Sequence, residues 1–246
     1  NARVTVIGVG GLGSPITQQL VAMGIGTIRI VDRDVVEVSN LHRQVLYGDE
    51  DVGLSKAEAA HDRLKRINPK VNIEPLTLSI NDDTVDEAIN GSDVVIDGLD
   101  SVSARYSINK ACVKLNIPYI FGSAIVTTGS STSIIPGKTP CLECFQPALK
   151  DDDMPKCGTE GVHPSILTTI SSVQVSETVR ILIGKEPNLA NKLFLADIKN
   201  LDYDKVKIIK QSRCKVCGPD ADLSIKESKR KLIEDICGRE GKSVHI

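Results

Sequence analysis

Four cysteines stand in two pairs of identical spacing, and this spacing is typical of metal-binding proteins. Each pair has the pattern C-x-x-C, the first at Cys141 and Cys144 and the second at Cys214 and Cys217. Four thiolates complete the tetrahedral coordination of Zn²⁺ with no open position, which is the chemistry of a structural zinc site. Two redox-active motifs are the alternative. A shared zinc ion would join two distant parts of the chain, so the spacing predicts one closed unit.

A glycine-rich turn near the start of the chain predicts a nucleotide-binding site. It follows a run of β-branched residues and opens a helical stretch, and its glycines are Gly8, Gly10, Gly11 and Gly13. Glycine permits the tight turn and lets backbone N–H groups approach a phosphate at a helix N-terminus. Asp32 ends the next predicted strand, where a carboxylate can accept hydrogen bonds from ribose hydroxyls. The alternative is a purely structural turn, and the pattern alone suits NAD, FAD or ATP.

The polar residues that follow favour ATP over a redox cofactor. They supply amides, cations and a carboxylate, in chain order at Asn40, Arg43, Gln44, Lys56 and Asp100. Arg and Lys offset the charge that develops on a triphosphate, and a carboxylate holds Mg²⁺, so we expect Asp100 to be the magnesium ligand. A hydride-transfer site needs no such set. Taken singly, each residue has a structural alternative: Arg43 and Lys56 as solvated charges, and Asp100 as a helix N-cap.

The elements that must position these residues alternate between strands and helices. Strands are predicted over residues 3–7, 27–31, 71–73, 93–97, 118–124 and 127–135, and near 192–197 and 205–209. Helices are predicted from residue 14 to the glycines at 24 and 26, over 55–67, 82–90 and 103–115, and from 164 to about 183. In the first helix, Ile16, Leu20 and Met23 share one face. The pattern indicates an α/β, Rossmann-like doubly wound fold with a largely parallel sheet, antiparallel late strands and a four-cysteine zinc knuckle.

Together, these motifs resemble the ThiF/MoeB-type ubiquitin-activating-like adenylyltransferases (the HesA/MoeB/ThiF family). The likeness runs in order over roughly residues 1–219. It implies the use of ATP and Mg²⁺, a structural Zn²⁺ and a homodimer. It also implies adenylylation of the C-terminal glycine carboxylate of a small ubiquitin-like or sulfur-carrier protein ending in Gly-Gly, with release of pyrophosphate. Thiamine, molybdopterin, tRNA thiolation and protein conjugation all use this enzyme type.

The resemblance also implies a role for each matched residue. The nucleotide-binding set comprises Gly8, Gly10, Gly11, Gly13, Asp32, Asn40, Arg43, Gln44, Lys56 and Asp100. Within it, Asp32 would bind ribose, Asn40 and Arg43 would contact the triphosphate, and Asp100 would hold magnesium. Lys56 would contact phosphate and stabilise the leaving pyrophosphate. The reaction is an in-line attack by a carboxylate on the α-phosphorus. Because both reactants are anions, catalysis rests on positioning and electrostatics.

A cysteine outside the pairs is a candidate nucleophile. Cys157 lies in a polar loop where some members of the family place a nucleophilic cysteine, so its thiolate is expected to displace AMP and form a thioester. An idle cysteine, as in members that stop at the adenylate, is the alternative. His163 begins the following helix, and capping or packing is a more common role for such a histidine than that of a general base.

Length and charge bound the remaining possibilities. The chain has 246 residues and a net charge of −2, which disfavours a general nucleic-acid binder. No apolar run is long enough for a membrane helix, and we expect a cytoplasmic protein. We expect residues 1–220 to form the adenylation domain and 221–246 an extension of unassigned role. The chain begins at Asn1 rather than Met, so residues upstream are expected, where the family carries an N-terminal arm.

Two other functions stay open at this point. The glycine turn and Asp32 alone also suit an NAD-dependent oxidoreductase. The missing arm suits a non-catalytic relative that acts as a scaffold for an active partner. Discriminating them requires the geometry around the charged residues.

Overall fold

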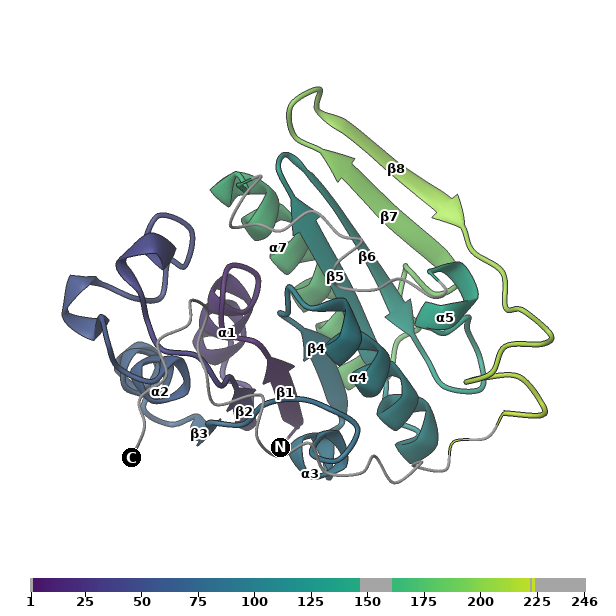
Figure 1. The fold of residues 1–246 in the computed structure, drawn as a ribbon, viewed down its shortest axis with the longest axis horizontal. Helices are drawn as coiled ribbons and strands as arrows, with labels where there is room; N and C mark the ends of the chain where they lie inside the picture. The colour runs from purple at the N-terminus through teal and green to yellow at the C-terminus, as the bar shows by residue number, and fades with distance from the viewer. Residues whose placement is uncertain (1, 147–160, 222, 224–246) are drawn as a thin grey trace, which may run out of the picture.

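An eight-stranded sheet forms the centre of the protein in the computed structural model, which describes residues 2–146, 161–221 and 223. Its strand order is β3-β2-β1-β4-β5-β6-β7-β8 (Figure 1). Strands β3, β2, β1, β4 and β5 are mutually parallel, and the pairs β5–β6, β6–β7 and β7–β8 are antiparallel. The predicted mostly parallel sheet with antiparallel late strands is therefore confirmed.

The predicted strands and long helices all occur, with shifts of a few residues at their ends. The strands are β1 (Arg3–Ile7), β2 (Thr27–Val31), β3 (Asn72–Leu76), β4 (Val94–Asp97), β5 (Tyr119–Ile125), β6 (Thr128–Ile134), β7 (Lys192–Asp197) and β8 (Asp202–Lys207). The α-helices are α1 (Gly13–Ala22), α2 (Lys56–Ile67), α3 (Val85–Ile89), α4 (Val102–Leu115), α5 (Leu142–Phe145) and α7 (Pro164–Leu182). The short elements α5 and the 3₁₀ helices η1 (Val38–Asn40) and η2 (Asp49–Asp51) were not predicted.

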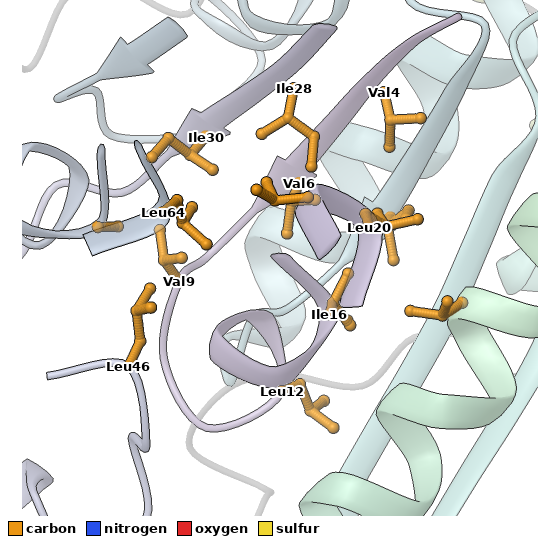
Figure 2. Packing of buried hydrophobic residues seen from close by; sticks show 14 of the residues in the cluster. Val4, Val6, Val9, Leu12, Ile16, Leu20, Ile28, Ile30, Leu46 and Leu64 are labelled. Carbon is orange, nitrogen blue, oxygen red and sulfur yellow. The ribbon is translucent and has the colours of Figure 1, made fainter. Parts of the chain in front are cut away.

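Helices cover both faces of the sheet, so the sheet separates two apolar cores. Helices α1, α2 and α7 pack on one face, where β1 contributes Val4 and Val6 to the first core. Figure 2 shows these valines beside Ile16 and Leu20 of α1. Helices α3, α4 and α5 cover the other face, where Ile7 joins the second core. Successive side chains of a strand point to opposite faces, which is why one short strand serves both cores.

The predicted end of the first helix is confirmed. Helix α1 ends at Ala22, and Met23 is its largely exposed C-cap residue, so burial on the shared face is limited to Ile16 and Leu20. Gly24 follows with a φ of +80°, a conformation that ends the helix and that glycine adopts readily. Within the described residues, no helix has both the length and the apolar character that a membrane crossing requires.

Candidate nucleotide site and cysteine cluster

The glycine turn joins β1 to α1 at the carboxyl end of the parallel strands, and backbone packing explains two of its glycines. Gly8 has a φ of +84°, and a Cβ on it would lie 2.7 Å from the carbonyl oxygen of Gly98. A Cβ on Gly13 would lie 1.9 Å from the carbonyl oxygen of Gly8. Neither position accommodates a side chain without backbone movement, so the turn closes against the loop that follows β4.

The other two glycines have different neighbours. A Cβ on Gly10 would meet Nε2 of Gln44 at 3.5 Å, an ordinary contact, whereas one on Gly11 would lie 2.7 Å from Cδ1 of Leu167 in α7. Among the described residues, the N–H groups of Gly10, Gly11 and Leu12 donate to no protein acceptor. Free N–H groups at the start of a helix are the usual protein ligands of a phosphate. The turn is therefore suited to an anion.

Asp32 is anchored to the glycine turn. It follows β2, accepts the N–H of Val9 at 2.8 Å with one carboxylate oxygen and accepts the N–H of Asp34 at 2.9 Å with the other. Burial raises the pKa of Asp32, while the nearby Lys56 ammonium and these two hydrogen bonds lower it. The structure thus places Asp32 directly beside the glycine turn, and its assignment to ribose stays a prediction.

Lys56 is buried beside the same turn. It begins α2, is only 6% exposed, and its Nζ lies 3.2 Å from a carboxylate oxygen of Asp34. The hydroxyl of Tyr47 donates to the carbonyl oxygens of Val9, at 2.9 Å, and Lys56, at 3.2 Å. The alternative that Lys56 is a solvated surface charge is therefore wrong. Tyr47 was not predicted as part of the site, because nothing in its local sequence reports a contact with residues so far along the chain.

The amide side chains of this segment are buried, whereas its guanidinium is not fixed against the glycine turn. Asn40 and Gln44 are both almost fully buried, and Oε1 of Gln44 has no hydrogen-bond partner within the described part of the chain. An unpaired buried oxygen beside Gly10 marks a place for a polar ligand or water. Arg43 is partly exposed and donates from Nη1 to the carbonyl oxygen of Ser39 at 2.8 Å. Its contact with a triphosphate stays a prediction.

Asp100 lies in the loop between β4 and α4 with an exposed side chain. In the part of the chain that the structure describes, its carboxylate has no hydrogen-bond or ion-pair partner. The alternative that Asp100 caps α4 is wrong, because the N-cap is Ser101, whose Oγ accepts the N–H of Ala104 at 3.4 Å. The charge of Asp100 helps to raise the pKa of Arg105, but its exposed carboxylate oxygens can still bind a cation at the loop that packs against Gly8.

The four paired cysteines converge on one point, as predicted. Their sulfur atoms all lie within 4.8 Å of one another. The separations are 3.5 Å for Cys141–Cys214, 3.4 Å for Cys144–Cys217 and 4.0 Å for Cys141–Cys144. A tetrahedron with Zn–S bonds of about 2.3 Å has edges of about 3.8 Å, so the cluster fits Zn²⁺.

The cysteine cluster belongs to the second core and is held by α4. The side chain of Asn109 accepts the N–H of Leu142 at 2.9 Å, and the hydroxyl of Tyr106 donates to the carbonyl oxygen of Gln146 at 2.7 Å. Burial raises the pKa of Cys141, with a further increase from the neighbouring thiols. Four thiolates in so small a volume repel one another unless a cation compensates their charge, which a divalent metal ion does.

The remaining sequence predictions have mixed outcomes. His163 caps α7 through Nδ1, which accepts the N–H of Ser165 at 3.2 Å, so the capping role is confirmed. Cys112 is buried in the second core, where burial raises the pKa of its thiol. Cys157 and residues 224–246 of the C-terminal extension lie outside the described residues.

Comparison with known proteins decides the family. The family model described as "ThiF family" matches residues 1–216. The chain belongs to the ThiF family. This agrees with the resemblance inferred from the glycine turn, the charged residues and the paired cysteines.

Individual relatives are named as an activating enzyme or as adenylyltransferases. The chain is 36% identical to the SAMP-activating enzyme E1 of Haloferax volcanii, over 92% of this chain and 84% of that protein. It is 35% identical to the sulfur carrier protein adenylyltransferase of Thermus thermophilus, over 96% and 88% respectively. It is 34% identical to the molybdopterin-synthase adenylyltransferase of Salmonella typhimurium, over 89% and 88%.

Two solved structures share the fold. The crystal structure of E. coli MccB with ATP superposes with a TM-score of 0.79 at 26% identity, covering 88% of this chain and 67% of MccB. The same enzyme with succinimide also gives a TM-score of 0.79, with 66% of its chain covered. This ThiF-family chain therefore spans about two thirds of the length of these solved chains.

Proposed function

We propose that this protein adenylylates the C-terminal glycine carboxylate of a small ubiquitin-like or sulfur-carrier protein, with ATP as the donor and pyrophosphate as the leaving group. The observation that carries the proposal is the combination of three features at the carboxyl end of the parallel strands. These are the free N–H groups of the glycine turn, the buried ammonium of Lys56 and the exposed carboxylate of Asp100. The names of the relatives support it, since those quoted above are adenylyltransferases or a SAMP-activating enzyme. An oxidoreductase has no use for this charge arrangement.

The proposed roles follow from where each residue lies. Phosphate oxygens accept from the free N–H groups of the glycine turn, and the carboxylate of Asp32 accepts from ribose hydroxyls. Lys56 offsets negative charge as pyrophosphate leaves. Its burial keeps water away, which strengthens that interaction. Arg43 leaves the Ser39 carbonyl and turns toward the polyphosphate, which Asn40 also contacts, while Gln44 lines the side of the turn at Gly10.

Magnesium and zinc have different proposed places. Mg²⁺ binds proteins through one or two carboxylates and keeps several waters, which suits the exposed Asp100. When bound there it neutralises charge on the polyphosphate. Zn²⁺ is the resident ion proposed for Cys141, Cys144, Cys214 and Cys217. We further propose a homodimer in the cytoplasm. The cysteines of the described residues are free, in keeping with a reducing compartment.

The test of the proposed function is pyrophosphate exchange into ATP. We expect exchange that requires a carrier ending in Gly-Gly and that stops when these two residues are deleted. Asp100→Ala should abolish exchange, because the metal-bound polyphosphate loses its protein ligand, with an unchanged thermal unfolding midpoint as the control for folding. Robust exchange by Asp100→Ala would remove the magnesium role, and tight NAD binding without ATP binding would overturn the adenylyltransferase assignment.

A second proposed step concerns Cys157. Its thiolate attacks the acyl carbon of the carrier adenylate, a thioester bond forms and AMP leaves with the electron pair of the broken acyl–phosphate bond. We expect Cys157→Ser to lose a covalent thioester adduct with the carrier, recognised by its cleavage through thiol exchange, while pyrophosphate exchange continues, because adenylylation precedes the thiol step. Cys112→Ser is the matched control, since that thiol is buried in the second core. An unchanged adduct in Cys157→Ser would exclude this cysteine as the nucleophile.

A further inference from the structure

A buried ionic network lies directly beneath the loop that carries Asp100. Its members are Asp97 and Tyr119, both fully buried, and Arg105, which is 5% exposed. Nε of Arg105 donates to Oδ2 of Asp97 at 2.9 Å, and the hydroxyl of Tyr119 donates to the same oxygen at 2.8 Å. The other oxygen of Asp97 accepts the N–H of Leu99 at 2.9 Å. Both oxygens of this carboxylate are therefore occupied, and Asp97 is not available to a metal ion.

The guanidinium of Arg105 also binds Leu99, the loop residue whose N–H is bound by Asp97. Nη2 of Arg105 donates to the carbonyl oxygen of Leu99 and, at 2.9 Å, to that of Gly122 in β5. The guanidinium also lies 5.5 Å from the ring centroid of Phe121. Both backbone polar groups of Leu99 are thus bound by the network. Leu99 is the residue immediately before Asp100, so the backbone that leads into the exposed carboxylate is held on two sides.

The loop is also fixed relative to the phosphate-facing turn. The N–H of Gly98 donates to the carbonyl oxygen of Ile7 at 2.7 Å, and a Cβ on Gly98 would lie 2.2 Å from the carbonyl oxygen of Gly8. No side chain separates the two loops at this point. A shift of the loop at Leu99 would therefore change the distance between Asp100 and the glycine turn.

Stability alone does not account for this network. A buried ion pair costs desolvation on both partners, and well-packed apolar residues of similar volume commonly replace one without loss of stability. Burial lowers the pKa of Arg105, but the charges of Asp97, Tyr119 and Asp100 and the hydrogen bond to Asp97 together raise the pKa above its ordinary value, so the guanidinium stays charged. A planar fork that binds a carboxylate and two carbonyl oxygens at once offers geometric precision that apolar packing does not.

We propose that Asp97, Arg105 and Tyr119 are positioning residues that hold the loop between β4 and α4 so that Asp100 faces the metal-bound polyphosphate. This inference rests on the proposed function, because it takes Asp100 as the magnesium ligand. The network acts through Leu99 and touches no substrate itself. Of the two acids in this segment, the buried Asp97 positions the loop and the exposed Asp100 binds magnesium.

The test compares Tyr119→Phe and Arg105→Lys with Asp100→Asn. Affinity for α,β-methylene-ATP is measured by calorimetry in magnesium-free buffer and with saturating Mg²⁺, and the ratio of the two dissociation constants gives the magnesium contribution. We expect this ratio to fall toward one in all three variants, while affinity without Mg²⁺ is unchanged. In pyrophosphate exchange, kcat should fall by about 10- to 100-fold, as expected for a misplaced catalytic group, with the KM for the carrier unchanged.

The matched control is Ser133→Ala. It removes a buried O–H donor to the carboxylate of Glu177, a hydrogen bond of 2.9 Å in a network that contacts residues 188 and 189 instead of the Asp100 loop. We expect a similar loss of thermal stability to that of Tyr119→Phe, with the magnesium ratio retained. If the magnesium ratio falls in Ser133→Ala as much as in the network variants, the fall reflects a general loss of stability, and the proposal is overturned.

A double-mutant cycle separates this inference from the proposed function. If Tyr119 acts through Asp100, Tyr119→Phe has no further effect on the magnesium ratio in an Asp100→Asn background. If the magnesium ratio is unchanged in Tyr119→Phe and Arg105→Lys but falls to one in Asp100→Asn, only the positioning role is overturned. A normal ratio in Asp100→Asn overturns both the magnesium role of Asp100 and the inference built on it.

Discussion

The cysteine cluster and the glycine-turn site are built in opposite ways from equally short motifs. In the cluster, four side chains converge in a buried core, and each is committed to the same point. At the glycine turn, backbone groups approach one another closely, and polar groups such as Asp100 and the amide oxygen of Gln44 are left uncommitted. The first arrangement suits an ion that stays, and the second suits ligands that enter, react and leave.

This difference predicts how stability and activity separate between the two regions. Changes in the cluster should affect folding first, because a structural metal contributes folding free energy. Changes at the open polar groups of the nucleotide site should affect catalysis with little change in stability.

Loss of one cluster thiol should have the largest effect. Cys214→Ser removes one of four ligands, and structural zinc binding is worth on the order of 10 kcal/mol in small zinc domains. We expect the thermal unfolding midpoint to fall by more than about 10 °C, since about 1 kcal/mol shifts a chain of this size by 2–4 °C. Metal analysis should find about one Zn per chain before the change. Cys112→Ala, a buried thiol outside the cluster, is the control, and an equal effect of both would contradict a shared zinc site.

A methyl group on Gly13 should have an intermediate effect. Its Cβ would lie 1.9 Å from the carbonyl oxygen of Gly8, so the backbone must move. We expect Gly13→Ala to cost about 1–3 kcal/mol of unfolding free energy, as overpacking does, and to abolish ATP binding. Gly10→Ala is the matched variant in the same turn, because its Cβ meets only Gln44 at 3.5 Å. Denaturant unfolding of the pair measures the difference, and equal losses would refute the distinction between the two glycines.

Neutralising Lys56 should affect stability least. Its partner Asp34 has a side chain that is 58% exposed and can be hydrated when the ammonium is removed. We expect Lys56→Met to change the unfolding free energy by less than about 1 kcal/mol, while kcat for pyrophosphate exchange falls by about 10²- to 10³-fold. Lys70→Met, on the exposed turn after α2, should keep full exchange. A large stability loss in Lys56→Met with normal exchange would make Lys56 a structural residue.

Hydrophobic pattern and spacing were sufficient to predict the main elements. The β-branched runs that became β1 and β4 are buried on both sides and the run that became β2 mainly on one, and such runs are recognisable without knowledge of their neighbours. The short helix α5 and the 3₁₀ helices were missed because tertiary contacts define them. The clearest case is the N-terminal N–H of α5 at Leu142, which is bound by Asn109, a residue of α4.

The sequence by itself determined which chemical groups this protein has and their order: a glycine turn, amides and charges, and two cysteine pairs. These are local properties, because spacing along one strand–turn–helix unit fixes where the groups lie relative to one another. Only the tertiary structure decided what each charge does: Lys56 is buried, Arg43 binds its own loop, and Asp97 at the end of β4 is enclosed whereas Asp100 in the loop after it is exposed. Burial and pairing depend on residues that are distant in the chain, and local sequence does not report those contacts.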